Sequence, residues 1–179
     1  MLPENIILLG FMGSGKTTTA KELSKLLDYE YWDMDQFIEK NSGLKISEIF
    51  ADKGESYFRE QEKVALDWVK TKKKFVISTG GGVWLDEINR SLLVKLGLCV
   101  WLKVSPEEAW KRVSKNLNQR PLLSCEGDPF DRLKSILESR TPIYSLAKKN
   151  VETDNKSPEL VAREILELIR NDELGKSTG

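Results

Sequence analysis

The stretch GFMGSGKT, residues 10–17, has residue types and spacing that can hold a phosphate group. The pattern G-x-x-x-x-G-K-[ST] is met by Gly10, Gly15, Lys16 and Thr17, between an apolar run and a segment with helical periodicity. Glycines let the backbone wrap around an anion, and N–H groups at a helix N-terminus present partial positive charge to it. Lys16 can reach the β- and γ-phosphates, and the Thr17 hydroxyl can ligate Mg²⁺. The loop predicts a nucleoside triphosphate as donor and leaves the acceptor open.

Two carboxylates follow the second apolar run, in the sequence YWDMD. Asp33 and Asp35 are two residues apart, so in an extended chain their side chains point to the same side. Ligands of open α/β sheets bind at the carboxyl ends of the strands, where both carboxylates would lie. One carboxylate could position hydrated Mg²⁺ while the other accepts a hydrogen bond from an alcohol. A capping role ahead of the helix QFIEK would also explain one of the two.

Arg59 and three consecutive glycines could line the acceptor side of the same edge. Arg59 lies in GESYFREQE with Glu55 four residues before it and Glu62 three after it, so a solvated salt bridge also explains it. The glycines Gly80, Gly81 and Gly82 follow the apolar run FVIS. They permit close approach of a ligand to the end of the third strand, and a flexible loop is the alternative.

Two further arginines stand in the second half of the chain. Arg120, in QRPLL, lies in a polar segment rich in turn formers, and as a lid residue it could neutralise the phosphates in transfer. Arg140, in ESRTPIY, could offer its planar guanidinium to a carboxylate of the acceptor. Each arginine, considered singly, is more often an ordinary surface residue.

The elements that must position these residues alternate between short apolar runs and helical segments. This alternation predicts an α/β fold with a mainly parallel sheet covered on both faces. Residues from about 34 to 70 read as a helical insertion between the second and third strands. Residues 116–129 read as a lid or a disordered segment, and residues 172–179 as a frayed tail. The pairs Ser105-Pro106 and Ser157-Pro158 predict helix starts.

Composition narrows the class of protein. A chain of 179 residues is expected to form one domain, and its 28 basic and 28 acidic side chains do not favour nucleic acid as partner. The absence of histidine excludes a His-based triad or His-ligated metal. No apolar run approaches a membrane span of roughly 18 residues, and no basic leader precedes the first strand. Two cysteines, Cys99 and Cys125, favour a reducing, cytoplasmic location, and we expect a monomer.

These motifs together resemble the shikimate kinase family. The resemblance runs through GFMGSGKTT, DMD, IEKNSGLKISEIF, GESYFREQE, STGGG, QRPLL and SRTPIY, in order and over nearly the whole chain. It implies a three-layer P-loop kinase fold with a five-stranded parallel sheet, a helical substrate-binding insertion and a mobile lid. It also implies ATP- and Mg²⁺-dependent phosphorylation of the 3-hydroxyl of shikimate, on the route to chorismate and the aromatic amino acids.

The resemblance assigns roles to individual residues. Asp35 would bind the reacting hydroxyl, with Lys16 and Arg120 as its catalytic partners. Thr17 would ligate the metal and Asp33 would act near it. The acceptor would be bound by Asp35, Arg59, Gly80, Gly81, Gly82 and Arg140. The nucleotide would be bound by Gly13, Ser14, Gly15, Lys16, Thr17, Thr18, Arg112, Arg120 and Lys156. Gln119 departs from the family pattern, in which a glycine often precedes the lid arginine.

Two other functions compete with this interpretation. A kinase for another small hydroxy acid, such as gluconate, shares the loop and the fold. A non-catalytic nucleotide-binding relative of a kinase is the second alternative. The aspartates, Arg59, the triple glycine and Arg140 favour shikimate over gluconate. The presence of Lys16, Thr17, Asp35 and Arg120 favours an enzyme over a non-catalytic relative.

Overall fold

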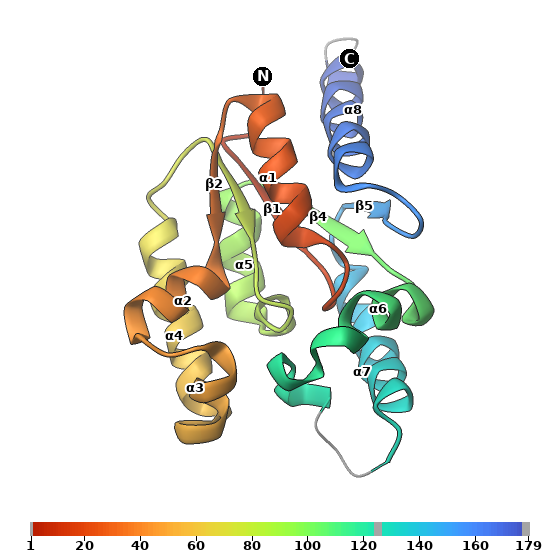
Figure 1. Cartoon of the computed structure of the whole chain (residues 1–179). Coiled ribbons are helices and arrows are strands. Elements are labelled where there is room, and N and C mark those ends of the chain that lie inside the picture. The colour runs from red at the N-terminus through yellow and green to blue at the C-terminus, as the bar shows by residue number, and fades with distance from the viewer. Residues whose placement is uncertain (1, 124–126, 177–179) are drawn as a thin grey trace.

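The protein is a three-layer α/β domain, described here by a computed structural model for residues 2–123 and 127–176 (Figure 1). Five parallel strands form one sheet in the order β2-β3-β1-β4-β5. The strands are β1 (Asn5–Leu9), β2 (Glu30–Asp33), β3 (Phe75–Ser78), β4 (Leu98–Lys103) and β5 (Lys149–Glu152). The predicted five-stranded parallel sheet is therefore confirmed.

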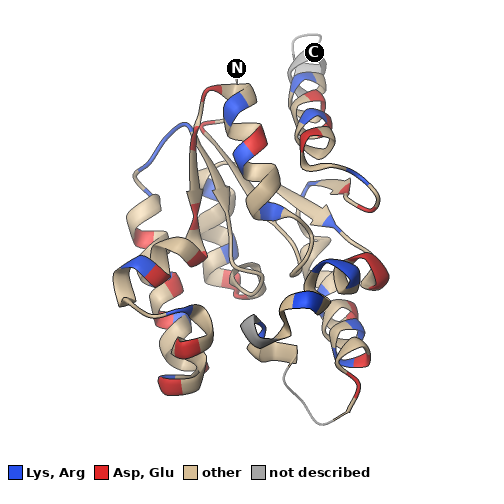
Figure 2. Cartoon of the chain, in the orientation of Figure 1, with Lys and Arg blue, Asp and Glu red and all other residues tan. Residues whose placement is uncertain are grey.

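Helices connect successive strands, as parallel pairing requires. They are α1 (Lys16–Leu27), α2 (Met34–Ser42), α3 (Ile46–Asp52), α4 (Gly54–Val69), α5 (Glu87–Leu96), α6 (Pro106–Val113), α7 (Pro129–Tyr144) and α8 (Pro158–Lys176). Three short 3₁₀ helices are η1 (Val83–Leu85), η2 (Ser114–Gln119) and η3 (Pro121–Leu123). Charged residues of both signs are interspersed over the outer helices (Figure 2).

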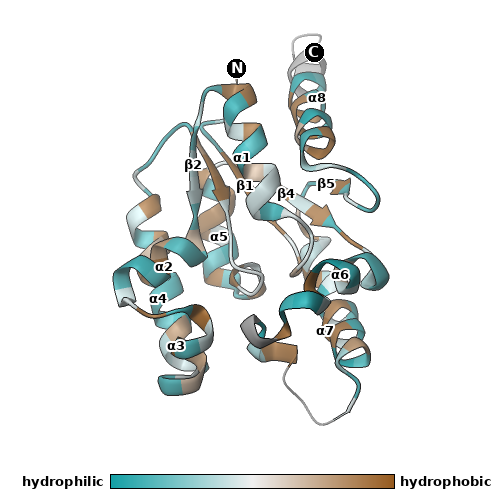
Figure 3. Ribbon diagram, viewed as in Figure 1, coloured by the Kyte–Doolittle hydropathy of each residue, from teal (hydrophilic) through white to brown (hydrophobic). Residues whose placement is uncertain are grey.

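The central strand β1 explains why the sheet is covered on both faces. All of its residues are buried, and successive side chains point to opposite faces. Ile6 and Leu8 pack in one cluster with residues of α1 and α8, whereas Ile7 and Leu9 pack in a second cluster with residues of α4 to α7. The polar outer and apolar inner sides of these helices can be followed in Figure 3. This core fixes the carboxyl ends of β1, β2 and β3, where the candidate residues lie.

Two predicted helix starts are found in the structure. Ser105 precedes α6 and its hydroxyl accepts a hydrogen bond from the Glu108 amide, with Pro106 as first helical residue. Ser157 precedes α8, and its hydroxyl accepts a hydrogen bond from the amide of Leu160. A serine cap followed by proline supplies an acceptor for an orphan N–H group and a preset φ angle, so these bounds follow from local chemistry.

The helical insertion and the lid segment face one another across the carboxyl edge of the sheet. Helices α2, α3 and α4 form the insertion, and η2 packs against α3 (Figure 1). The segment 116–129 is more regular than expected, because most of its first half is wound into η2 and η3. Residues 124–126, including Cys125, lie outside the described residues.

The tail predicted to fray covers residues 172–179. The backbone of α8 continues to Lys176. Residues 177–179 lie outside the described residues. Among the described residues, no helix combines the length and the apolar character needed to span a membrane.

Candidate active site

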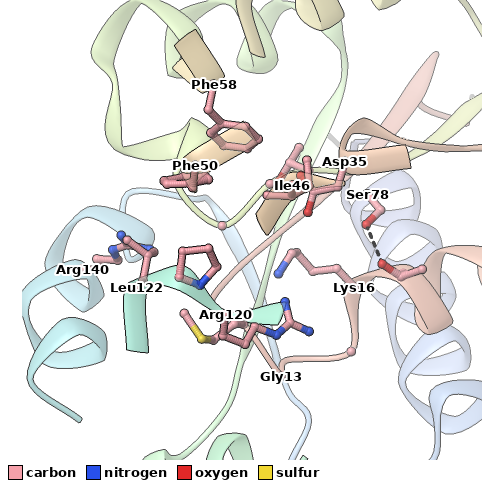
Figure 4. Close-up of a pocket in the computed structure, with 18 of the residues that line it drawn as sticks. Gly13, Lys16, Asp35, Ile46, Phe50, Phe58, Ser78, Arg120, Leu122 and Arg140 are labelled. Carbon is pink, nitrogen blue, oxygen red and sulfur yellow. Dashed lines mark hydrogen bonds between the residues drawn. The ribbon is translucent and has the colours of Figure 1, made fainter. Parts of the chain in front are cut away.

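One cavity of about 330 Å³ opens at the carboxyl edge of the sheet, between the phosphate loop, the insertion and the η2–η3 segment. Figure 4 shows its side chains converging from these three parts of the chain. Predicted residues that line it are Gly13, Gly15, Lys16, Thr17, Thr18, Asp35, Arg59, Gly80, Gly81, Gly82, Arg112, Arg120 and Arg140. The fold thus brings donor-side and acceptor-side candidates from distant parts of the sequence to a single space.

The phosphate loop is folded tightly ahead of α1. Gly13 has φ +77°, and a Cβ at this position would lie 3.0 Å from the Ala109 carbonyl oxygen, so a side chain here is strained and crowded. The Lys16 ammonium donates to the carbonyl oxygens of Gly10 and Phe11, both at 2.9 Å. Burial lowers the pKa of Lys16 to about 8, and the carboxylates of Asp35 and Asp33 oppose this shift. An incoming phosphate would offer the ammonium a stronger acceptor than these carbonyls.

Asp33 is joined to the start of α1 by a short polar network. The Thr17 hydroxyl donates to Asp33 Oδ2 at 2.8 Å and lies 3.4 Å from the Ser78 hydroxyl. Asp33 Oδ1 accepts a hydrogen bond from the Gln36 amide at the N-terminus of α2. Tyr31 donates to Asp33 Oδ2 at 3.3 Å. Asp33 therefore caps α2 with one carboxylate oxygen and contacts Thr17 with the other.

Asp35 stands in the first turn of α2 and faces Lys16 across the cavity (Figure 4). Its Oδ1 atom is buried and has no hydrogen-bond partner in the protein. Burial raises the pKa of Asp35 to about 6, with a further rise from Asp33, while Lys16 and Arg120 lower it. A buried carboxylate oxygen without a partner, close to two cations, is suited to receive the hydroxyl of a ligand.

Arg59 is held by two glutamates and also reaches the cavity. It donates to Glu55 Oε1 at 2.6 Å and to Glu62 Oε2 at 2.8 Å. Glu62 is 1% exposed, and its pKa is raised by burial while Arg59 lowers it. The guanidinium lies so close to Gly82 that a Cβ there would be 2.5 Å from Arg59 Nη1. The predicted salt bridges are present, and they aim the guanidinium at the glycine loop rather than at solvent.

The two remaining arginines come from different elements. Arg120 follows η2, lines the cavity beside Pro121 and Leu122, and has a buried Nε atom without a protein partner. Arg140, on α7, also lines the cavity, and its guanidinium lies 6.0 Å from the centre of the Phe11 ring. Lys16 and Arg140 thus stand at separate parts of the same space, with Arg120 adding a third positive charge (Figure 4).

A second cavity of about 280 Å³ adjoins the phosphate loop on its other side. Arg112 lines both cavities, donating to the Gly13 carbonyl at 2.9 Å, the Thr153 carbonyl at 2.7 Å and Glu108 at 2.9 Å. Of the predicted nucleotide residues, Ser14 and Lys156 line only this second cavity. Lys156 forms an ion pair with Glu164. A nucleotide with its phosphates on the loop could extend its base toward this side.

Sequence reasoning missed several residues that line the cavity or lie beside it. Glu62 was read only as a salt-bridge partner of Arg59, although its Oε1 atom is buried without a hydrogen-bond partner. A Cβ on Gly80 would lie 3.0 Å from Glu62 Oε1 and 3.1 Å from Asp35 Oδ1, so the glycine leaves room beside both. Ser78 and the apolar pair Phe50 and Phe58 line the cavity itself. Spacing along a helix gave the only signal for Glu62.

Comparison with known proteins identifies the family of this chain. The shikimate kinase family model matches residues 12–170, which is most of the chain. The chain belongs to the shikimate kinase family. A curated shikimate kinase from Moorella thermoacetica is 43% identical over 169 residues, covering 94% of this chain and 96% of the relative.

Solved structures agree with the assignment. A shikimate kinase from Acinetobacter baumannii, solved in complex with shikimate, superposes with a TM-score of 0.91 and 38% identity. The match covers 97% of this chain and 96% of that one. A gluconokinase from Sinorhizobium meliloti is 15% identical, with a TM-score of 0.61 and 99% of both chains covered. That likeness shows a shared fold alone, so the family assignment rests on the shikimate kinases.

Proposed function

We propose that this member of the shikimate kinase family transfers the γ-phosphoryl group of ATP to the 3-hydroxyl of shikimate, giving shikimate 3-phosphate and ADP. The observation that carries the proposal is the single cavity in which the Lys16 ammonium, the Asp35 carboxylate and the guanidiniums of Arg59 and Arg140 meet. The Lys16 ammonium suits a triphosphate and the Asp35 carboxylate suits an alcohol. The guanidiniums of Arg59 and Arg140 suit a carboxylate. Shikimate is an acceptor with both an alcohol and a carboxylate.

The donor binds at the phosphate loop. Backbone N–H groups from Gly13 to Thr18 and the N-terminus of α1 surround the β-phosphate, and Lys16 moves from the loop carbonyls to the phosphate oxygens. The base extends toward Arg112 and Lys156. Positive charge held in place before the reaction stabilises the phosphoryl group as charge develops on it.

The residues beside the loop fit a magnesium ion. Mg²⁺ prefers hard oxygen ligands and is usually bound by one or two protein groups together with substrate phosphates and water. The Thr17 hydroxyl and the Asp33 carboxylate, 2.8 Å apart, supply such oxygens. In the described residues no group of three or more acidic, cysteine or histidine side chains forms a separate metal site. Thr17 would hold the ion directly and Asp33 through water, and the ion would neutralise phosphate charge.

On the acceptor side, Arg59 and Arg140 bind the carboxylate, and Asp35 receives the reacting hydroxyl. Asp35 Oδ1 accepts the proton of the 3-hydroxyl as its oxygen bonds to the γ-phosphorus of ATP. The bond between the γ-phosphorus and the oxygen that bridges to the β-phosphate breaks, and ADP leaves. Direct in-line transfer needs no phosphoenzyme.

Arg120 and the apolar side chains around it exclude water from the transfer. Pro121, Leu122, Phe50 and Phe58 all line the cavity, so apolar side chains from the η3 segment and from the insertion border the acceptor, and Figure 4 shows Leu122 on the η3 side and the two phenylalanines on the insertion side. Arg120 adds positive charge where the phosphoryl group passes from donor to acceptor. Keeping water out limits the hydrolysis of ATP that would otherwise compete with transfer.

The proposal is tested by coupled ADP release with ATP, Mg²⁺ and a panel of acceptors. We expect ADP production that depends on shikimate and that is at least tenfold slower with gluconate, a hydroxy acid without the ring. Lys16→Met serves as the control protein, because it keeps an unbranched side chain of similar bulk and removes the ammonium group with its charge and its hydrogen-bond donors. Shikimate-independent ADP release, or equal rates with gluconate, would contradict the proposed acceptor.

A further inference from the structure

Tyr144, the last residue of the SRTPIY motif, has a buried hydroxyl that the proposed function does not use. The side chain is 0% exposed. Its ring stacks on Trp101 of β4, with ring centres 6.0 Å apart and planes inclined by 28°. Its hydroxyl donates a hydrogen bond to the carbonyl oxygen of Gly81. Ring packing anchors the phenol in the core, so the hydroxyl holds the glycine loop at a set position against α7.

A second hydrogen bond joins the same two segments in the opposite direction. Trp84 lies in η1, directly after the glycines, and its indole Nε1 donates to the Ile143 carbonyl at 2.9 Å. Trp84 is 1% exposed and Tyr144 is 0% exposed, so both donor side chains are buried. The loop that carries the glycines and the end of α7 are thus tied together twice, by two buried aromatic side chains.

This joint lies between the two arginines that bind the acceptor carboxylate. Arg140 is four residues before Tyr144 on α7, which places both on the same side of the helix. Gly82, next to Gly81, is in contact range of the Arg59 guanidinium. A shift of the Gly81 carbonyl relative to α7 would therefore change the separation between Arg59 and Arg140.

We propose that Tyr144 is a positioning residue for the acceptor: its bond to Gly81 fixes the glycine loop, and with it Arg59, relative to Arg140. The inference rests on the proposed function, because it concerns the same acceptor site. Burial raises the pKa of Tyr144, while the charges of Arg140 and Arg59 and a hydrogen bond between Arg140 and the phenol oppose the rise, so the phenol stays protonated and is in direct contact with Arg140. Tyr144 itself does not line the cavity, so it acts through Gly81 rather than on the acceptor.

The test is Tyr144→Phe, which removes the hydroxyl and keeps the ring stacked on Trp101. We expect the KM for shikimate to rise roughly 3- to 10-fold, the size of one lost buried hydrogen bond, with the KM for ATP unchanged. In an Arg140→Ala background the same substitution should change the shikimate KM less than twofold, because one of the two positioned groups is gone. Tyr29→Phe is the matched control. Its hydroxyl donates to the Pro3 carbonyl at 2.8 Å, remote from the cavity, and its loss should leave both KM values unchanged.

The following results would overturn the proposed role of Tyr144. A Tyr144→Phe protein with an unchanged shikimate KM would overturn the inference while leaving the proposed function intact. Equal rises in the KM values for shikimate and ATP would also overturn it, because they would indicate a general structural role. If the unmodified protein transfers no phosphoryl group to shikimate, the proposed function fails and the inference fails with it.

Discussion

The substitution Gly82→Ala should displace the Arg59 guanidinium without straining the backbone. Gly82 has φ −99° and ψ −17°, angles that alanine adopts freely. The added Cβ would lie 2.5 Å from Arg59 Nη1 and 2.9 Å from Nη2. Since such atoms need a separation of about 3.5 Å, the guanidinium must move by about 1 Å. The substitution is therefore a steric probe of Arg59.

This movement disturbs the position of Arg59, because ion pairs with Glu55 and Glu62 hold the guanidinium in place. If the displaced guanidinium loses one hydrogen bond to the carboxylate of shikimate, the binding free energy weakens by about 1.5–3 kcal/mol. At 1.4 kcal/mol for each factor of ten, the Kd for shikimate should rise roughly 10- to 150-fold. The Kd for ATP should change little, because the donor binds at the phosphate loop.

The assay is calorimetric titration of each ligand into Gly82→Ala, Arg59→Ala and the double variant. If the methyl group acts through Arg59, it should have almost no further effect once Arg59 is alanine. An unchanged shikimate Kd in Gly82→Ala would refute the reasoning. So would fully additive costs in the double variant, because the methyl group would then be acting on something other than Arg59.

Three further predictions concern single groups. Asp35→Asn should lower kcat by roughly 100- to 10,000-fold while ATP binding is kept, since it removes a general base; near-normal turnover would exclude that role. Because the pKa of Asp35 is raised to about 6 and the ionised form accepts the proton, kcat/KM should fall as the pH drops through about 6; a level profile down to pH 5 would contradict this. Burial raises the pKa of Cys99 to about 12, so iodoacetamide at pH 8 should label it only after unfolding, as peptide mass mapping can check. Equal labelling rates in native buffer and in urea would show that this thiol is accessible.

The donor half of the site was predictable because it is local. A phosphate loop is a continuous stretch in which glycines, a lysine and a helix start determine one backbone shape, and α1 begins at Lys16 as its sequence indicates. The fold class followed from alternation of apolar runs and helices, and it is confirmed together with the family. The order of the strands was not predicted, because it depends on packing between segments far apart in the sequence.

The acceptor half was predictable only through the combination of motifs. Arg59 alone indicated a surface salt bridge, and the structure contains that bridge, yet Glu62 is buried and turns the guanidinium toward Gly82. Sequence spacing cannot distinguish an exposed partner from a buried one. The hydroxyl of Tyr144 had no sequence signal at all, because its partner Gly81 is 63 residues away. The roles of the site residues remain predictions for experiment.

The central claim is that the phosphoryl group leaves ATP for a hydroxyl of shikimate within one cavity. Mass spectrometry of the reaction mixture tests it most directly, by comparing the ADP formed with the phosphorylated shikimate formed. We expect equal amounts of the two products. Phosphorus–proton coupling in the NMR spectrum should place the phosphate on the 3-oxygen of shikimate. ADP accompanied by inorganic phosphate, with no phosphorylated shikimate, would contradict it.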